Sequence, residues 1–383
     1  MVERIFVESK AIFMSIMAAW IPTGVLTYIS SCINAASVVV LAIVITMILT
    51  WMERKALARF QDRYGPNRVG PVGLLQPVAD VIKLMLKEDL VPASADRLVH
   101  ALAPAVVVSA ALGLFLMIPF GKDMVAADFN AGLLFFLAFS GLQVPGVIMG
   151  GWGSRNKFSV LGGMRTAAQL LSYEVPVMIC IVAVVMMAGS LSMTEIVEAQ
   201  SGLWYAATPW GACGFLIFIL GGTAESKRAP FDLPEAESEI VAGYHTEYSG
   251  MKFALFFLAE YIGAFAMGAL GATLFLGGWK GPAIMPSWIW FLAKSFGVFF
   301  VLIWFRATLP RFRVDQLLAF AWVFLFPMSL LVLLCAAVWY YLSLVVSIPL
   351  SLAILLTGYW GFSGLLFAEY RRMNRPVEVR GAG

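Results

Sequence analysis

Apolar stretches, most of them close to 20 residues long, recur along the whole chain. A helix of about 20 residues rises about 30 Å, which matches the hydrocarbon core of a bilayer. The composition is 61% hydrophobic, whereas a soluble globular chain is nearer half, so a soluble domain is excluded. Barrel strands would be about 10 residues long and alternating, a pattern that is not seen here. Spans are predicted at 33–51, 101–120, 132–150, 164–188, 209–223, 252–275, 287–305, 317–340 and 344–367.

These stretches predict an all-α fold, a polytopic transmembrane helical bundle with 8–9 spans. Residues 1–32 are expected to form an N-terminal interfacial segment, because Pro22 and Gly24 interrupt their weak apolar run. Residues 33–367 form the transmembrane domain, with large charged loops at about 52–100 and 224–251. Residues 368–383 form a basic C-terminal tail. Most of the 26 Lys and Arg residues lie in alternate connections and in this tail, so the positive-inside rule places them in the cytoplasm.

The first charged loop contains a short amphipathic segment, residues 76–88. Pro77 suits a first helical turn, and Asp80, Lys83 and Lys87 fall on one face. An apolar stripe covers another face: Val78, Val81, Ile82, Met85 and Leu86. Thirteen residues cannot cross a bilayer, so this segment is predicted to be a helix that lies in the membrane interface.

The same loop interleaves arginines with turn-forming residues, in the stretch QDRYGPNRVGPVG that follows Glu53-Arg54-Lys55. One interpretation is a basic loop that sets topology and contacts anionic headgroups. The other is a rigid funnel that presents bases such as Arg54 and Arg63 beside a cavity at membrane level. Topology alone does not need so many glycines and prolines.

The second loop, residues 224–249, concentrates acid in a chain of which only 13% is charged. Its six carboxylates are Glu225, Asp232, Glu235, Glu237, Glu239 and Glu247. Carboxylates this close titrate as a coupled set, which could pass protons or respond to a nearby charge. A solvated loop is the alternative, but the apolar residues threaded through it indicate a folded, partly buried loop.

Two further acids, Glu174 and Glu260, lie within predicted spans. Each costs about 2.5–3.5 kcal/mol at mid-helix on insertion scales unless it faces water or a partner. Proton relay is therefore one hypothesis, and a hydrogen bond to a neighbouring helix is the other. Lys294 is a candidate counter-charge. His100 and His245 are poorly placed for haem, and the scattered cysteines favour no metal site and no iron–sulfur cluster.

Four segments carry a resemblance to a known family. The stretches ERKALARFQDRYGPNRVGPVGLLQPVADVIKLMLKED and RAPFDLPEAESEIVAGYHTEYSGMKFALFFLAEY resemble the signature segments of the H subunits of bacterial respiratory complex I, the proton-translocating NADH:quinone oxidoreductase. RATLPRFRVDQL and MRTAAQLLSYEVP are similar to two further motifs of that family. The resemblance covers residues 51–326, and the charged positions match throughout.

The resemblance implies a membrane-arm subunit of an enzyme that is not active alone. Such a subunit forms the quinone access chamber, and an acidic chain couples quinone reduction to proton translocation. By motif position, the quinone-binding residues would be Arg54, Arg63, Asp80, Lys83, Arg228, Phe231 and Arg306. The acidic chain would be Glu174, Glu225, Asp232, Glu235, Glu237, Glu239, Glu247 and Glu260.

Quinone is then the implied substrate, and no FMN, iron–sulfur cluster or haem is expected on this chain. The implied partners are the hydrophilic quinone-module subunits, the small membrane-arm subunits and the lipid bilayer of a bacterial cell inner membrane, but no nucleic acid. Two alternatives remain open. One is the anchor subunit of a related membrane-bound hydrogenase or formate hydrogenlyase. The other is an ion-coupled secondary transporter, which an internal repeat would favour; no such repeat is visible in the sequence.

Overall fold

The computed structural model describes residues 22–122, 124–233, 237–282, 284–342 and 344–373, together with residues 8, 10 and 12–15. Within these ranges, 8 helices are long and apolar enough to cross a bilayer. The regular structure there is helical, apart from a bridge between Gly121 and Met124. The prediction of an all-α, polytopic membrane bundle is confirmed.

In chain order the elements are α2 (Thr23–Phe60), η2 (Pro71–Gly73), α3 (Gln76–Leu86), α4 (Arg97–Met117), α5 (Gly132–Gly141), α6 (Gln143–Gly153), α7 (Lys157–Ala188), α8 (Met193–Ala199), η3 (Tyr205–Ala207), α9 (Pro209–Glu225), α10 (Glu237–Ile240), η4 (Gly243–His245), α11 (Gly250–Phe275), α12 (Ser287–Thr308), α13 (Val314–Ala319), η5 (Phe320–Leu325), α14 (Phe326–Tyr341) and α15 (Leu344–Met373). Helices α5 and α6 together form one candidate span, and α13, η5 and α14 form another.

Helix α9 occupies one of the predicted spans but is shorter than the others. Its 17 residues rise slightly less than the roughly 30 Å of a hydrocarbon core. Pro209 occupies its first turn, and the Thr208 hydroxyl accepts a hydrogen bond from the Gly211 amide at 3.1 Å. The eight long spans and this shorter helix therefore account for the predicted 8–9.

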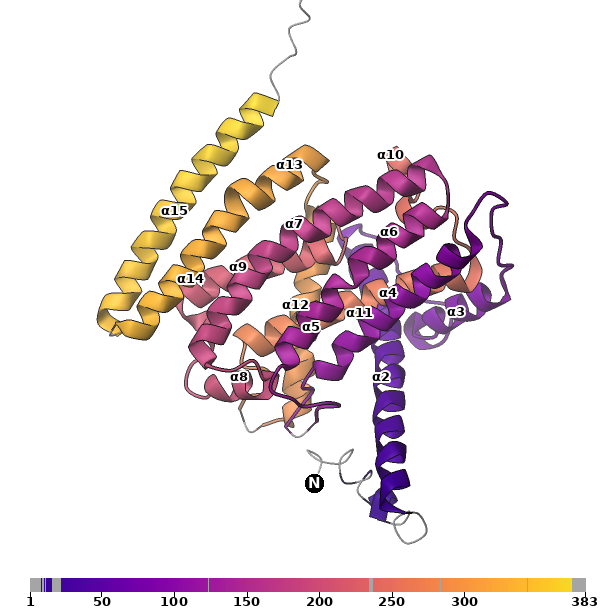
Figure 1. The fold of residues 1–383 in the computed structure, drawn as a ribbon, viewed down its shortest axis with the longest axis horizontal. Helices are drawn as coiled ribbons and strands as arrows, with labels where there is room; N and C mark the ends of the chain where they lie inside the picture. Colours follow the sequence, from indigo (N-terminus) through magenta and orange to yellow (C-terminus); the bar gives the residue numbers. More distant parts are fainter. Residues whose placement is uncertain are drawn as a thin grey trace, which may run out of the picture.

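Helix α11 lies at the centre of the bundle and α15 at its edge. In the apolar window of α11, 61% of the residues are buried, against 11% for α15. Figure 1 shows α15 on the outer side of α14, whereas α4, α6 and α7 lie side by side across the body. The lower part of α2 projects below the other helices in this view. Residues from α2, α4, α7, α9, α11 and α12 contribute to one core cluster around α11.

The boundaries of the first charged connection differ from the prediction. Helix α2 continues past Trp51 to Phe60, because residues 52–60 include several strong helix formers and the turn at Gly65-Pro66 comes only later. Helix α4 begins at Arg97, where the Asp96 side chain accepts hydrogen bonds from the next turn. The connection therefore covers residues 61–96, and Glu53 lies on a helix. Helix α2 begins at Thr23; much of the predicted 1–32 segment lies outside the described residues.

The predicted interfacial helix is present as α3, which packs against α2 and α11. It has Pro77 in its first turn, as expected. The predicted apolar stripe is exposed along its whole length: Val78, Val81, Ile82, Met85 and Leu86. An exposed apolar stripe on a helix too short to span is the arrangement expected for a helix in the headgroup region.

Candidate functional site

Four charged side chains from distant parts of the sequence form a buried charge cluster: Glu53, Arg228, Glu260 and Arg306. Oε1 of Glu53 forms ion pairs with both Arg228 and Arg306. A longer contact of 3.9 Å joins Arg228 to Oε1 of Glu260. Glu53 and Arg228 are each only 1% exposed. Charges this deeply buried are stable only when paired, and here two acids face two bases.

Aromatic rings complete the surroundings of Arg228. Its guanidinium lies 4.6 Å from the ring centre of Tyr261 and 5.2 Å from that of Phe299. Burial alone would lower the pKa of Arg228, but the Glu53 carboxylate outweighs burial and the pKa lies above its usual value. Arg228 is therefore a fixed positive charge at the centre of the molecule, held by an ion pair and two rings.

A small acidic cavity lies beside this cluster, at the junction of α6, α7, α9 and α11. It contains three carboxylates and one amine, those of Glu174, Glu225, Glu260 and Lys227. Other residues that line it include Leu114, Ser140, Gln143, Val144, Leu170 and Met267. Its volume for water-sized molecules is about 20 Å³, which is enough for about one water. It is too small for a quinone headgroup.

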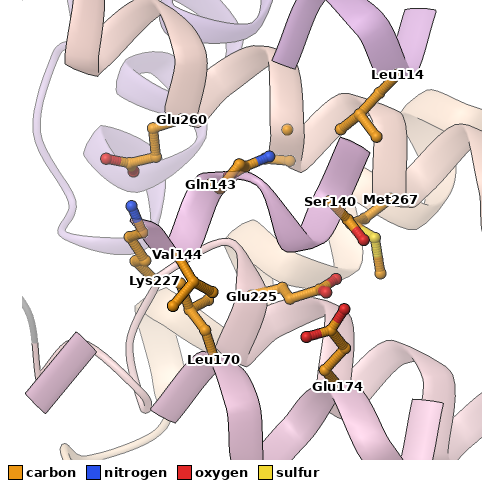
Figure 2. A pocket seen from close by; sticks show the side chains of 12 residues that line it. Leu114, Ser140, Gln143, Val144, Leu170, Glu174, Glu225, Lys227, Glu260 and Met267 are labelled. Carbon is orange, nitrogen blue, oxygen red and sulfur yellow. The ribbon is translucent and has the colours of Figure 1, made fainter. Parts of the chain in front are cut away.

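Figure 2 shows that the acidic cavity has two different ends. At one end the carboxylates of Glu174 and Glu225 point toward each other. At the other end the amine of Lys227 points toward the carboxylate of Glu260, and the amide of Gln143 lies between the two ends. Two facing carboxylates in a confined space favour one shared proton, whereas a carboxylate beside an amine favours the ionised form. The carboxylates can take up and release protons, and one water in the cavity can carry a proton between them, while the Gln143 amide can only donate and accept hydrogen bonds.

Asp232, Glu239 and Glu247 do not line the acidic cavity, and each of them has a partner of its own. Asp232 pairs with Arg311 at 3.1 Å, and Glu239 with Arg165 at 2.6 Å. Glu247 accepts a hydrogen bond of 2.5 Å from the Asn156 side chain. Glu237 begins α10, and Glu235 lies outside the described residues. The structure thus brings Glu174, Glu225 and Glu260 together. It places Asp232, Glu239 and Glu247 along the loop at residues 226–249, the acidic loop.

The predicted quinone-binding residues divide between two places. Arg228 and Arg306 belong to the buried charge cluster. Arg54 and Arg63 line a separate surface pocket of about 400 Å³, with Leu57, Tyr64, Gly65 and Pro66. In that region Arg54 pairs with Asp80 of α3 at 2.6 Å, while Lys83 is exposed on the same helix.

The structure places two of the predicted residues, Phe231 and Lys294, away from the positions that the sequence suggests. Phe231 is 1% exposed and packs between the rings of Tyr173 and Phe312, so it belongs to the core and lines neither pocket. The sequence makes Lys294 a candidate counter-charge for an intramembrane acid. Instead its amine donates to the backbone carbonyls of Leu276, Gly278 and Lys280, at 2.6, 3.0 and 2.5 Å. Those carbonyls end α11 and begin the next loop, and they satisfy the lysine locally.

Sequence reasoning did not assign three residues that are central here: Glu53, Lys227 and Gln143. The sequence groups Glu53 with the charged loop, because Glu53 lies just after the predicted end of the apolar run. Its position within helical residues could have been inferred from the helix formers after it. Lys227 is one of two basic residues in the acidic segment, and the sequence gives it no separate role. Gln143 gives no signal in the sequence, because a single amide side chain in an apolar run usually makes an ordinary hydrogen bond between helices.

Most of the chain is similar to known proteins. A family model described as NADH dehydrogenase matches residues 33–337. The H subunit of NADH-quinone oxidoreductase from Dehalococcoides mccartyi is 52% identical over 288 residues, which cover 75% of this chain and 80% of that protein. An H subunit numbered 2, from Syntrophobacter fumaroxidans, is 50% identical over 311 residues, covering 79% and 93%. The H subunit from Geobacillus kaustophilus is 50% identical over 305 residues, covering 78% and 90%.

Proposed function

The chain belongs to the NADH dehydrogenase family of membrane subunits that includes the NADH-quinone oxidoreductase H subunits, and from this we propose how it works. It acts as one subunit of a proton-translocating NADH:quinone oxidoreductase and is not active alone. Quinone is its substrate, and its acids couple quinone reduction to proton movement. The family match favours this function over a secondary transporter or a hydrogenase anchor.

One observation carries the coupling proposal: the acidic cavity lies directly beside the buried charge cluster, and Glu260 belongs to both. Quinone reduction creates an anion that must take up protons. In a poorly hydrated interior, a new charge acts on its neighbours far more strongly than in water. A charge change felt at Arg228 or Arg306 would therefore reach Glu260 and, through the cavity, Glu225 and Glu174.

The surface pocket at Arg54 and Arg63 is the part of this chain that fits quinone access. Its volume of about 400 Å³ lies in the range of small-molecule sites. Two arginines line it, and the ion pair of Arg54 with Asp80 links it to α3, whose apolar stripe is exposed; this combination suits a ligand with a polar head and a lipid tail. Asp80 holds Arg54 in place through this ion pair, and Lys83 adds positive charge nearby. Arg228, Phe231 and Arg306 would act deeper, through the charge cluster and its packing.

The proposed acidic chain runs from the cavity along the acidic loop. Glu174, Glu225 and Glu260 are its inner members. The outer members are Asp232, Glu235, Glu237, Glu239 and Glu247. The paired outer acids can exchange partners when charge changes, which would connect the loop to neighbouring subunits.

Partners and location follow from the same proposal. Hydrophilic quinone-module subunits would cover the charged loops, and small membrane-arm subunits would contact the lipid-facing helices. The chain would sit in the bacterial inner membrane, with residues 61–96, the acidic loop and the C-terminal tail in the cytoplasm. The concentration of Lys and Arg in these segments supports that orientation.

Replacement of Glu225 tests this function. Glu225→Gln keeps the size of the side chain but removes its ability to gain or lose a proton. We expect NADH oxidation by quinone to fall at least about 100-fold, the lower end of the range for loss of a proton-transfer group. NADH oxidation by a soluble electron acceptor, which bypasses the membrane arm, should stay unchanged. Both rates are measured on membranes in which the assembled complex is quantified. Native quinone-dependent turnover in the assembled Glu225→Gln enzyme would refute the proposal.

A further inference from the structure

Lys227 lies in a place where lysine is rare. It is 6% exposed, and a lysine this deeply buried is almost always paired. Its amine is 3.3 Å from the Tyr244 hydroxyl and 4.8 Å from the centre of that ring. The same amine lines the acidic cavity and points toward Glu260 (Figure 2). The side chain thus contacts the Tyr244 ring of the acidic loop and extends toward the carboxylate of Glu260.

The backbone at Lys227 is also unusual. Its φ angle is +54°, in the left-handed region that glycine adopts without cost and a side chain does not. A non-glycine residue persists in this conformation only where its surroundings hold it, and such positions cluster at functional sites. Glycine would adopt this turn at a lower cost. The presence of lysine therefore indicates a role for its side chain that is separate from the backbone turn.

Several elements around the acidic cavity and the buried charge cluster carry charged or titratable groups. They are Glu225 at the end of α9, Glu174 on α7, Glu260 on α11, Arg228 next along the chain, Glu53 on α2, and Tyr244 and His245 of η4. Burial and the charge of Lys227 lower the pKa of His245 to about 4, so this histidine is neutral at neutral pH. Arg228 and Arg306 form ion pairs with Glu53, and Arg228 also contacts Glu260 at 3.9 Å. Lys227 is the basic residue that lines the acidic cavity.

We propose that Lys227 is a positioning residue of the proton path, whose charge divides the acidic cavity into two ends. Together with Arg228, it favours the ionised form of Glu260 and thereby confines the exchangeable proton to Glu174 and Glu225. Among the described residues, no ion pair joins Glu174 or Glu225 to a base. The proton therefore has one preferred resting place, from which a charge change at the Glu260 end can release it. This inference rests on the proposed function and specifies how its acidic cavity is tuned.

The test is the pH profile of quinone-dependent NADH oxidation by the assembled complex. In Lys227→Gln and Lys227→Gly, loss of the positive charge makes the nearby carboxylates hold protons to higher pH. The profile should therefore move to alkaline pH by about one unit, the lower range for a close charge. Lys227→Arg keeps the charge and should keep the native profile. Lys252→Gln is the matched control, because Lys252 pairs with Asp89 outside the cavity and its loss should leave the profile unchanged.

A purely structural role for Lys227 gives different results. An unshifted profile in the neutral variants would overturn the inference, and so would an equal shift in Lys227→Arg. Lys227→Gly suits the local backbone, so it decides the matter if Lys227→Gln does not assemble; failure of both to assemble would show a folding role and also overturn it. Failure of the proposed function is distinct, because it appears as native turnover in Glu225→Gln. If Glu225→Gln loses quinone-dependent turnover but the neutral Lys227 variants keep the native pH profile, only the inference about Lys227 is wrong and the proposed function stands.

Discussion

At the scale of single residues, Glu53 holds the centre of the molecule together. Its carboxylate faces Arg228 and Arg306, which come from positions far along the chain. Removing one partner of a buried ion pair leaves uncompensated charge, which costs far more than the pair contributes when intact. The stability of the site should therefore depend on Glu53 more than on any exposed ion pair.

Glu53→Gln tests this dependence. We expect the free energy of unfolding to fall by about 3–5 kcal/mol, because Arg228 and Arg306 lose their shared counter-charge. The measurement is the thermal unfolding midpoint of the purified complex, with the amount assembled in membranes. Asp89→Asn is the control; it breaks a partly exposed pair with Lys252 and should cost no more than about 1 kcal/mol. Equal stability of the two variants would show that Glu53 does not hold the cluster.

At the scale of elements, α7 is the scaffold of the acidic loop. Its Gln169 side chain donates to the carbonyls of Ala224 and Phe231, at 2.8 and 2.7 Å. Its Ser159 hydroxyl donates to the Tyr244 carbonyl at 2.9 Å. Gly162 of the same helix lets the loop approach at backbone distance. The helix that carries Glu174 thus also holds in place the acidic loop, which carries the outer members of the proposed acidic chain.

Gly162→Ala should weaken this contact. A Cβ at Gly162 would lie 2.6 Å from the Cα of Gly243, closer than real Cβ contacts. The loop must shift, and we expect a loss of about 1–3 kcal/mol, seen as a lower unfolding midpoint and faster proteolysis of the loop. Gly361→Ala in α15 is the control, because nothing lies within 4 Å of that added Cβ. If both variants have the same unfolding midpoint, the backbone contact between α7 and the acidic loop does not contribute to stability.

At the scale of the whole molecule, apolar length predicted the bundle well, because span length depends on bilayer thickness and not on tertiary contacts. The helix α3 and its stripe were also predictable, since periodicity is local. The ends of the helices were harder to predict. Helix α2 continues through Glu53, because residues after the apolar run are still strong helix formers. The site was predicted only in part. Which acid meets which base depends on packing between distant helices, so neither the pairing of Glu53 nor the capping role of Lys294 could be inferred.

The whole-molecule claim is that three acids in one cavity couple quinone chemistry to proton movement. The measurement that tests it most directly is the number of protons moved per NADH oxidised, in inverted membrane vesicles with Glu174→Gln or native enzyme. We expect Glu174→Gln to move fewer protons per NADH or to stop quinone-dependent oxidation, because its end of the cavity can no longer hold the proton. Asp89→Asn should match native vesicles. Native turnover together with native proton stoichiometry in Glu174→Gln would contradict the account.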